Sequence, residues 1–159
     1  MLLLAAVALI ARAASKGSNL LLNIGPDASG QIPAKAAIDD NKDSLWHSHP
    51  EPMAKNDPLP PPQSFTVDCG AVREMRGFTY TPRPVSCSVG VVDKCEFWVS
   101  LDGKDWTKAA EGSFPDVLES RKTREVKFVK PVKARYFHFV ATHALPVDDR
   151  LAVAEVDVF

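Results

Sequence analysis

Residues 94–106 read KCEFWVSLDGKDW, and this stretch decides the class of fold. Its first part, residues 94–100, contains Phe, Trp and Val, a composition typical of a β-strand. Asp102-Gly103, which follows, is a dipeptide that closes tight turns between paired strands. Because side chains alternate across a strand, Phe97 and Trp98 face opposite sides, and one of the two must face away from the main core. An outward Trp98 would mark a contact with a neighbouring domain.

Strand signals continue on both sides of this stretch. Apolar and polar residues alternate in short segments, and turn-forming residues separate one segment from the next. No convincing helix follows residue 34, so the chain from there on is predicted to be all-β, an antiparallel β-sandwich. The expected strands cover residues 64–70, 77–83, 94–100, 123–130, 134–142 and 151–159.

Length and charge narrow the class of protein further. At 159 residues the chain is long enough for one good-sized domain plus an appendage. It has 19 basic and 20 acidic residues, for a net charge of −1. This balance gives no electrostatic reason to expect nucleic acid or an anionic membrane surface as a partner.

The three cysteines do not form a recognisable framework. Their number is odd and no Cys-x-x-Cys pair is present, so neither a set of disulfides nor a zinc site is indicated. Cys69 and Cys95 fall on strand positions, where we expect small core side chains. Cys87 falls in a loop, and the sequence leaves open whether Cys87 and Cys95 form a disulfide.

Residues 1–33 differ from the rest of the chain and form a separate unit in the predicted division into 1–33 and 34–159. The run MLLLAAVALIARAAS has an apolar core before Ala11-Arg12-Ala13, as in a signal peptide, which would make the protein secreted, extracellular or periplasmic. The same run read as a helix would cover a neighbouring sheet, and it is too short to span a bilayer. Residues 20–24, LLLNI, are apolar on both faces, as in the buried strands of parallel sheets.

Several motifs after residue 36 resemble one family. They are AIDDNKDSLWHS at 37–48, SLDGKDW at 100–106, Ala134-Arg135-Tyr136 and Ala154-Glu155-Val156. Together they resemble the coagulation factor V/VIII C-type, or discoidin-like, domain, and within it the family 32 carbohydrate-binding modules. The resemblance implies a jelly-roll-like, galactose-binding-type β-sandwich with binding loops at one end.

The N-terminal unit resembles a different family. ARAASKGSNLLLNIGPDASGQIP, residues 11–33, is similar to the end of the catalytic barrel of α-L-fucosidases. The resemblance implies that residues 1–33 are a helix and a buried strand left from a (β/α) barrel, and that a glycosidase catalytic domain is a partner. The nucleophile of that family has no counterpart in this chain. The acidic pairs Asp39-Asp40 and Asp148-Asp149 are interpreted as a cation loop and a solvated loop tip, so no catalytic residue is identified.

The discoidin-like resemblance also implies a structural calcium ion. Carried over to this chain, its ligands are Asp39, Asn41, Ser44 and Glu155, and the ion would pin the loop to the last strand. Asp40 replaces the glycine of the family, which strains the turn if the position needs a positive φ. The alternative is a hydrogen-bonded loop without metal.

The same resemblance places a sugar site at the loop end. His47 corresponds to a ligand histidine that donates or accepts, and Arg83 to a ligand arginine with a planar donor fork. Further candidate contacts are His49 and Ser88.

The aromatic part of this sugar site departs from the family. Pro50 stands where some members have a stacking tryptophan, and Leu151 replaces a loop aromatic. Trp46 and Trp106 match positions that serve packing in the family. The polar half of the site is therefore present and the stacking half is missing, which predicts weak binding or a different ligand.

Three functions remain in view at this point. The first is a carbohydrate-binding module for galactose- or fucose-type glycans, as the C-terminal part of a fucosidase-like glycoside hydrolase. The second is an accessory domain that stabilises a glycosidase barrel. The third is a discoidin-type module that binds proteins or lipid surfaces, although the exposed apolar or basic loop residues such a module uses are not evident in the sequence.

Overall fold

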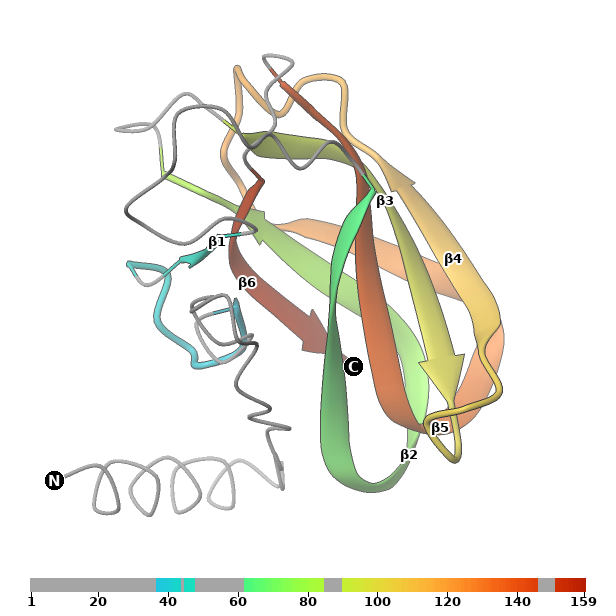
Figure 1. Cartoon of the computed structure of the whole chain (residues 1–159). Helices are drawn as coiled ribbons and strands as arrows, with labels where there is room; N and C mark the ends of the chain where they lie inside the picture. Colours follow the sequence, from blue (N-terminus) through green and yellow to red (C-terminus); the bar gives the residue numbers. More distant parts are fainter. Residues whose placement is uncertain (1–36, 44, 48–61, 85–89, 146–150) are drawn as a thin grey trace, which may run out of the picture.

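The computed structural model describes residues 37–43, 45–47, 62–84, 90–145 and 151–159, and this part of the chain is built from strands (Figure 1). They form one sheet in the order β1-β6-β2-β5-β3-β4, and a parallel pairing of Val91 with Ala152 also joins β3 to β6. The all-β prediction is confirmed. The predicted N-terminal unit, residues 1–33, lies outside the described residues. The strands are β1 (Trp46–His47), β2 (Gln63–Pro82), β3 (Val91–Ser100), β4 (Thr107–Ser113), β5 (Arg124–Leu145) and β6 (Ala152–Val158).

Two long strands carry the chain from one layer to the other. β2 and β5 pair antiparallel, with Phe65 opposite Phe139 in one part and Gly77 opposite Lys127 in another. The register shifts between Asp68 and Arg73, where Gly70 has a φ of 76°. A bulge of this kind lets a strand turn a corner while its pairing resumes on the other side. Both strands curve round at the lower end of Figure 1.

This bend corrects the predicted strand boundaries. The segments predicted at 64–70 and 77–83 are two parts of β2, and those at 123–130 and 134–142 are two parts of β5. The turn residues that suggested strand ends mark bends within continuous strands. The sequence analysis also missed β4, because its sequence TKAAEGS has little intrinsic strand preference and is held by pairing with β3.

Aromatic rings fill the space between the layers. Phe78 of β2 stacks on Phe97 of β3, with ring centroids 4.5 Å apart. Trp46 is 2% exposed and contacts Phe65 at 5.0 Å, which confirms its packing role. Phe97 is fully buried while Trp98 beside it is partly exposed, so the predicted division between the two is confirmed.

The Asp-Gly turn between β3 and β4 is as predicted. Oδ1 of Asp102 accepts hydrogen bonds from the backbone N–H groups of Lys104 and Asp105 at 2.9 and 3.0 Å. These donors, with the Ser100 hydroxyl, lower the pKa of Asp102 to about 2. Gly103 has a φ of 75°, a conformation that favours glycine.

The two described cysteines belong to the core, as predicted. Cys69 and Cys95 are buried free thiols, and burial raises their pKa values to about 11 and 12. Because Cys95 is a free thiol, the Cys87–Cys95 disulfide is ruled out in this structure. Cys87 lies outside the described residues.

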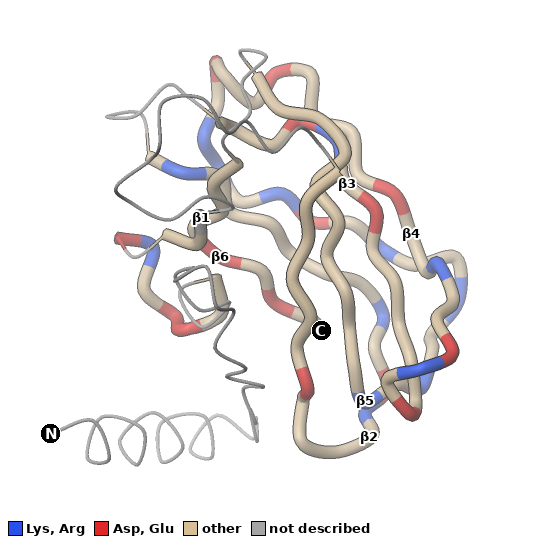
Figure 2. Tube along the Cα trace, viewed as in Figure 1, with Lys and Arg blue, Asp and Glu red and all other residues tan. Residues whose placement is uncertain are grey.

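Charge on the described surface is mixed. Figure 2 shows basic and acidic segments interspersed along the strands, with neither sign gathered over one face. Among the described residues, no helix is long and apolar enough to cross a membrane.

Candidate functional site

Two of the predicted sugar residues, His47 and Arg83, lie at the end of the sheet where β6 runs between β1 and β2. His47 of β1 pairs with Ala152 of β6, and Pro82 of β2 pairs with Val153. Arg83 follows Pro82 directly and is only 7% exposed. The structure therefore places positions 47 and 83 on opposite sides of the same two-residue segment of β6.

A second arginine, which the sequence analysis did not select, lies near this end. Nε and Nη1 of Arg121 are buried, and the described part of the chain gives them no hydrogen-bond partner. Burial lowers the pKa of Arg121, and the positive charge of Arg83 lowers it further. The two guanidinium groups thus create a positive region at this end of the sheet. No sequence motif marked Arg121, because its closeness to Arg83 arises from the fold.

The predicted cation loop has an ordered backbone. Oδ1 of Asp39 accepts the Asn41 N–H at 3.0 Å, and Oδ1 of Asn41 accepts the Asp43 N–H at 3.1 Å. Asp40 has a φ of 61°. The condition under which Asp40 was expected to strain the turn, a positive φ at this position, is therefore met.

Glu155 faces this loop from β6 in an unfavourable environment for a charge. It is 6% exposed, and within the described part of the chain neither carboxylate oxygen has a partner that meets the geometric criteria of a hydrogen bond. Its pKa is raised to about 8, chiefly by burial and in addition by the negative charges of Asp157, Asp39 and Asp40, while the backbone N–H of Asp40 acts in the opposite direction. A cation placed here would offset this burial and repulsion.

The described residues contain no cluster of three or more His, Cys, Asp or Glu side chains suited to a metal. A cation at this loop would therefore need amide and carbonyl oxygens as well as Asp39 and Glu155, a mixture that suits calcium. Ser44, the remaining predicted ligand, lies outside the described residues.

Three other residues considered for the sugar site, His49, Ser88 and Pro50, lie outside the described residues. The acidic pair Asp148-Asp149 also lies outside them. Leu151 is fully buried, so its side chain belongs to the core and not to a sugar-binding surface.

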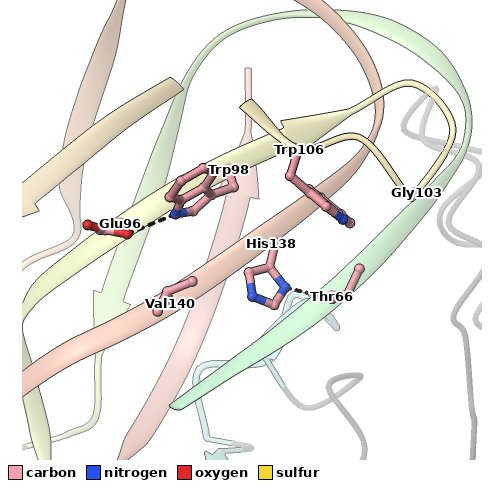
Figure 3. Close-up of a pocket in the computed structure, with 7 residues that line it drawn as sticks. All are labelled: Thr66, Glu96, Trp98, Gly103, Trp106, His138 and Val140. Carbon is pink, nitrogen blue, oxygen red and sulfur yellow. Dashed lines mark hydrogen bonds between the residues drawn. The ribbon is translucent and has the colours of Figure 1, made fainter. Parts of the chain in front are cut away.

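A separate pocket of about 580 Å³ lies on the outer face of the β2–β5–β3 layer (Figure 3). The strand register creates it, because Thr66 of β2 pairs with His138 of β5, which pairs with Trp98 of β3. The alternation of outward Thr66 and His138 with buried phenylalanines was a signal that sequence analysis had available and did not use. The lining residues are Thr66, Glu96, Trp98, Gly103, Trp106, His138 and Val140.

The polar groups of this pocket are held in place by one another. Trp98 Nε1 donates to Glu96 at 2.9 Å, and Lys108 Nζ donates to the other Glu96 oxygen at 3.3 Å. The Trp98 bond is the larger cause of a lowered Glu96 pKa, followed by Lys108. Oγ1 of Thr66 and Nδ1 of His138 are 2.7 Å apart, and burial lowers the pKa of His138.

Trp106 completes the pocket. Its ring lies 5.5 Å from the His138 ring, and its side chain is partly exposed, so it serves more than core packing. Glycoside hydrolysis normally needs two carboxylates that flank the scissile bond, whereas this pocket contains one, Glu96. Its groups offer hydrogen-bond donors and acceptors and two indole rings.

Comparison with known proteins identifies the type of domain. The family model for the F5/8 type C domain matches residues 14–156. The galactose oxidase of Gibberella zeae is 31% identical over 125 residues, which cover 77% of this chain and 17% of that protein. The chain therefore spans less than a fifth of the length of this curated relative.

Solved structures agree in fold. A family 32 carbohydrate-binding module of Clostridium perfringens, in complex with GalNAc-β-1,3-galactose, is 32% identical with a TM-score of 0.67, covering 85% of this chain and 88% of that one. The family 32 module of NanJ from the same organism, in complex with galactose, is 29% identical with a TM-score of 0.65, covering 81% and 85%.

Proposed function

This chain belongs to the F5/8 type C domain family, and from that premise we propose that it is a carbohydrate-binding module for galactose- or fucose-type glycans. One observation carries the proposal: β1 and β2 flank β6, so positions 47 and 83 lie on its two sides at one end of the sheet. Similar modules of about 30% identity are solved in complex with galactose and GalNAc-β-1,3-galactose.

The two positions supply complementary chemistry. Arg83 presents a planar fork of donors that matches two adjacent hydroxyls of a sugar, and His47 donates or accepts one further bond. Trp46 is buried in the core, and Leu151 is a buried aliphatic side chain, so neither can stack on the sugar. We therefore expect weak binding governed by hydrogen bonds, with strength gained through repeated contacts to a multivalent glycan.

We also propose that a calcium ion binds between the Asp39–Asn41 loop and β6. Its ligands are Asp39, Asn41, Ser44 and Glu155, together with backbone carbonyls of the loop. When bound, the ion supplies the positive charge that the buried Glu155 carboxylate lacks. It thereby pins the segment before β1 to β6, next to the sugar site, and takes no part in a reaction.

We place the module in a secreted protein, beside a glycosidase catalytic domain of the fucosidase type. The resemblance of residues 11–33 to the end of the fucosidase barrel supports this. In that setting the module tethers the catalytic domain to its substrate.

Glycan-array binding tests the function, with Arg83→Lys as the informative variant. Lysine keeps the charge and loses the fork, so the proposal predicts loss of signal on galactose- and fucose-terminated glycans without loss of folding. Arg76→Lys, at an exposed arginine bonded to Glu74, is the matched control and keeps the signal. Equal binding by Arg83→Lys and the wild type would contradict the assignment of Arg83, and a wild type that binds no such glycan would contradict the function.

A further inference from the structure

The pocket on the outer face of the sheet has the construction of a binding site. Thr66, His138, Trp98 and Lys108 form one row across β2, β5, β3 and β4, because each is paired with the next. The sequence neighbours of Thr66, His138 and Trp98, among them Phe97, face the core and are buried. The row is therefore fixed to four strands of the rigid part of the fold, and not to loops.

The side chains in this pocket are oriented before any ligand arrives. The bond from Trp98 Nε1 to Glu96 fixes the plane of the indole, and Lys108 lies 5.9 Å from the centre of the same ring. Trp106 enters from the turn after β3, close to His138, so Figure 3 shows two indoles around one hollow. Such preorganisation reduces the entropy lost on binding.

These groups combine two kinds of contact that a sugar ring uses. The partly exposed indoles of Trp98 and Trp106 offer apolar faces for the C–H groups of a pyranose. Burial lowers the pKa of His138 and so favours the uncharged imidazole, and its Nε2 has no partner in the described part of the chain. Glu96 oxygens and the Thr66 hydroxyl add acceptors for sugar hydroxyls.

Charge and size narrow the ligand further. Glu96 and Glu111 both contact Lys108, so two carboxylates surround one ammonium group beside the pocket. This excess of negative charge disfavours uronic acids and other anionic sugars. The volume of about 580 Å³ falls within the range of about 300–1,000 Å³ typical of ligand pockets.

From this geometry we propose that the outer-face pocket is a second saccharide site, which binds a neutral pyranose between Trp98 and Trp106. It is built from β2, β5 and β3 and the β3–β4 turn, whereas the loop-end site is built around β6. The two sites bind independently, so one module engages two sugars of the same glycan. Two weak sites joined in one domain would raise the overall avidity.

NMR of the full chain tests this second site through the indole N–H signals. The chain has three tryptophans, so Trp98→Phe and Trp106→Phe variants assign all three signals. Lactose and cellobiose serve as neutral probes, and digalacturonic acid as the acidic one. The proposal predicts saturable shifts of the Trp98 and Trp106 signals with at least one neutral disaccharide and no saturation with the acidic one.

Variants separate this site from the loop-end site. Trp106→Ala is expected to weaken the pocket affinity at least tenfold, while Trp106→Phe keeps a ring and most of the affinity. Leu101→Ala, at an exposed residue of the same turn, is the matched control and leaves binding unchanged. Arg83→Lys leaves the pocket affinity within twofold of the wild type, whether or not it abolishes glycan binding at the loop end.

Three results would overturn the proposal. One is that neither neutral disaccharide moves the Trp98 and Trp106 signals. Another is that the shifts disappear in Arg83→Lys, which would leave a single site. The third is that the signals move with protein concentration and not with sugar, which would assign the pocket to contact with a second copy of the chain.

Discussion

Asp40 is the described non-glycine residue whose backbone is held in the left-handed region, with a φ of 61°. Aspartate adopts this conformation more readily than most residues, but at a free-energy cost that glycine avoids. Its side chain also adds negative charge near the buried Glu155. The sequence alone suggested the strain, because glycine occupies this position in the resembled family.

Replacing Asp40 by glycine should stabilise the protein. Relief of the backbone strain and of the repulsion toward Glu155 is expected to add about 1 kcal/mol to the free energy of unfolding. For a chain of this length that raises the melting temperature by about 2–4 °C. Asp43→Gly, in the same loop at an ordinary φ, is the control and lowers it; an equal response of the two variants in thermal melts would contradict this account.

Glu155 makes stability depend on pH in a definite direction. Its pKa is raised from 4.5 to about 8 in the folded protein, so the folded state holds the proton more tightly than the unfolded state. In excess chelator, stability is therefore greatest below about pH 4.5 for this group and falls as the pH rises toward 8. Each pKa unit between the two states corresponds to about 1.4 kcal/mol.

Calcium should reverse this dependence. Because the ion binds the ionised carboxylate, added calcium is expected to raise the melting temperature most at pH 8 and little at pH 5. Glu155→Gln should remove both the fall in chelator and the response to calcium. Melting curves of the wild type that are the same in calcium and in chelator at pH 8 would contradict the calcium site.

At the level of elements, sequence analysis located strand residues better than strand ends. The alternation in 64–70 and 77–83 was real, but Gly70 bends the chain without ending β2. A bend and a turn have the same local composition, and only the pairing with β5 distinguishes them. β4 is a strand that local composition did not indicate, because pairing with β3 stabilises it and its own residues have little strand preference.

Strand pairing, which the local sequence does not reveal, also limited the prediction of the two sites. The resemblance selected His47, Arg83, Asp39 and Glu155, and the strand order explains why they lie near one another. The outer-face pocket was not predicted, because it depends on the register that aligns Thr66 with His138 and Trp98. Alternation tells which residues face outward, whereas the register tells which of them meet.

Gly77 of β2 lies so close to its neighbours that a side chain at this position would disturb the packing. A Cβ atom there would lie 2.4 Å from the Val126 carbonyl oxygen and 2.5 Å from the Phe159 ring. Gly77→Ala is therefore expected to cost about 1–3 kcal/mol, seen as a lower midpoint in denaturant unfolding. Ser64→Ala, at an exposed position of the same strand, is the control and changes stability little. Adding Phe159→Ala to the Gly77→Ala variant is expected to restore only part of the lost stability, because the new Cβ atom still lies too close to the Val126 carbonyl oxygen.

At the scale of the whole molecule, the two long strands unite both layers and separate the two proposed sites. The core between the layers holds Trp46 and Phe97, while the outer face of one layer carries Trp98. Composition and alternation were enough to predict this class of fold. The loop-end site required the closure of the sheet, which brings β1 and β2 to the two sides of β6.

The most direct test of the central claim is an NMR titration of the wild-type chain with galactose and with fucose, followed through backbone amide signals. The account predicts saturable shifts centred on Trp46, His47, Arg83, Ala152 and Val153 with at least one of the two sugars. Arg83→Lys should weaken this response about tenfold or more, because a charge-assisted pair of hydrogen bonds is lost. If both sugars leave these five amides unmoved in the folded protein, the loop end is not a sugar site and the account is wrong.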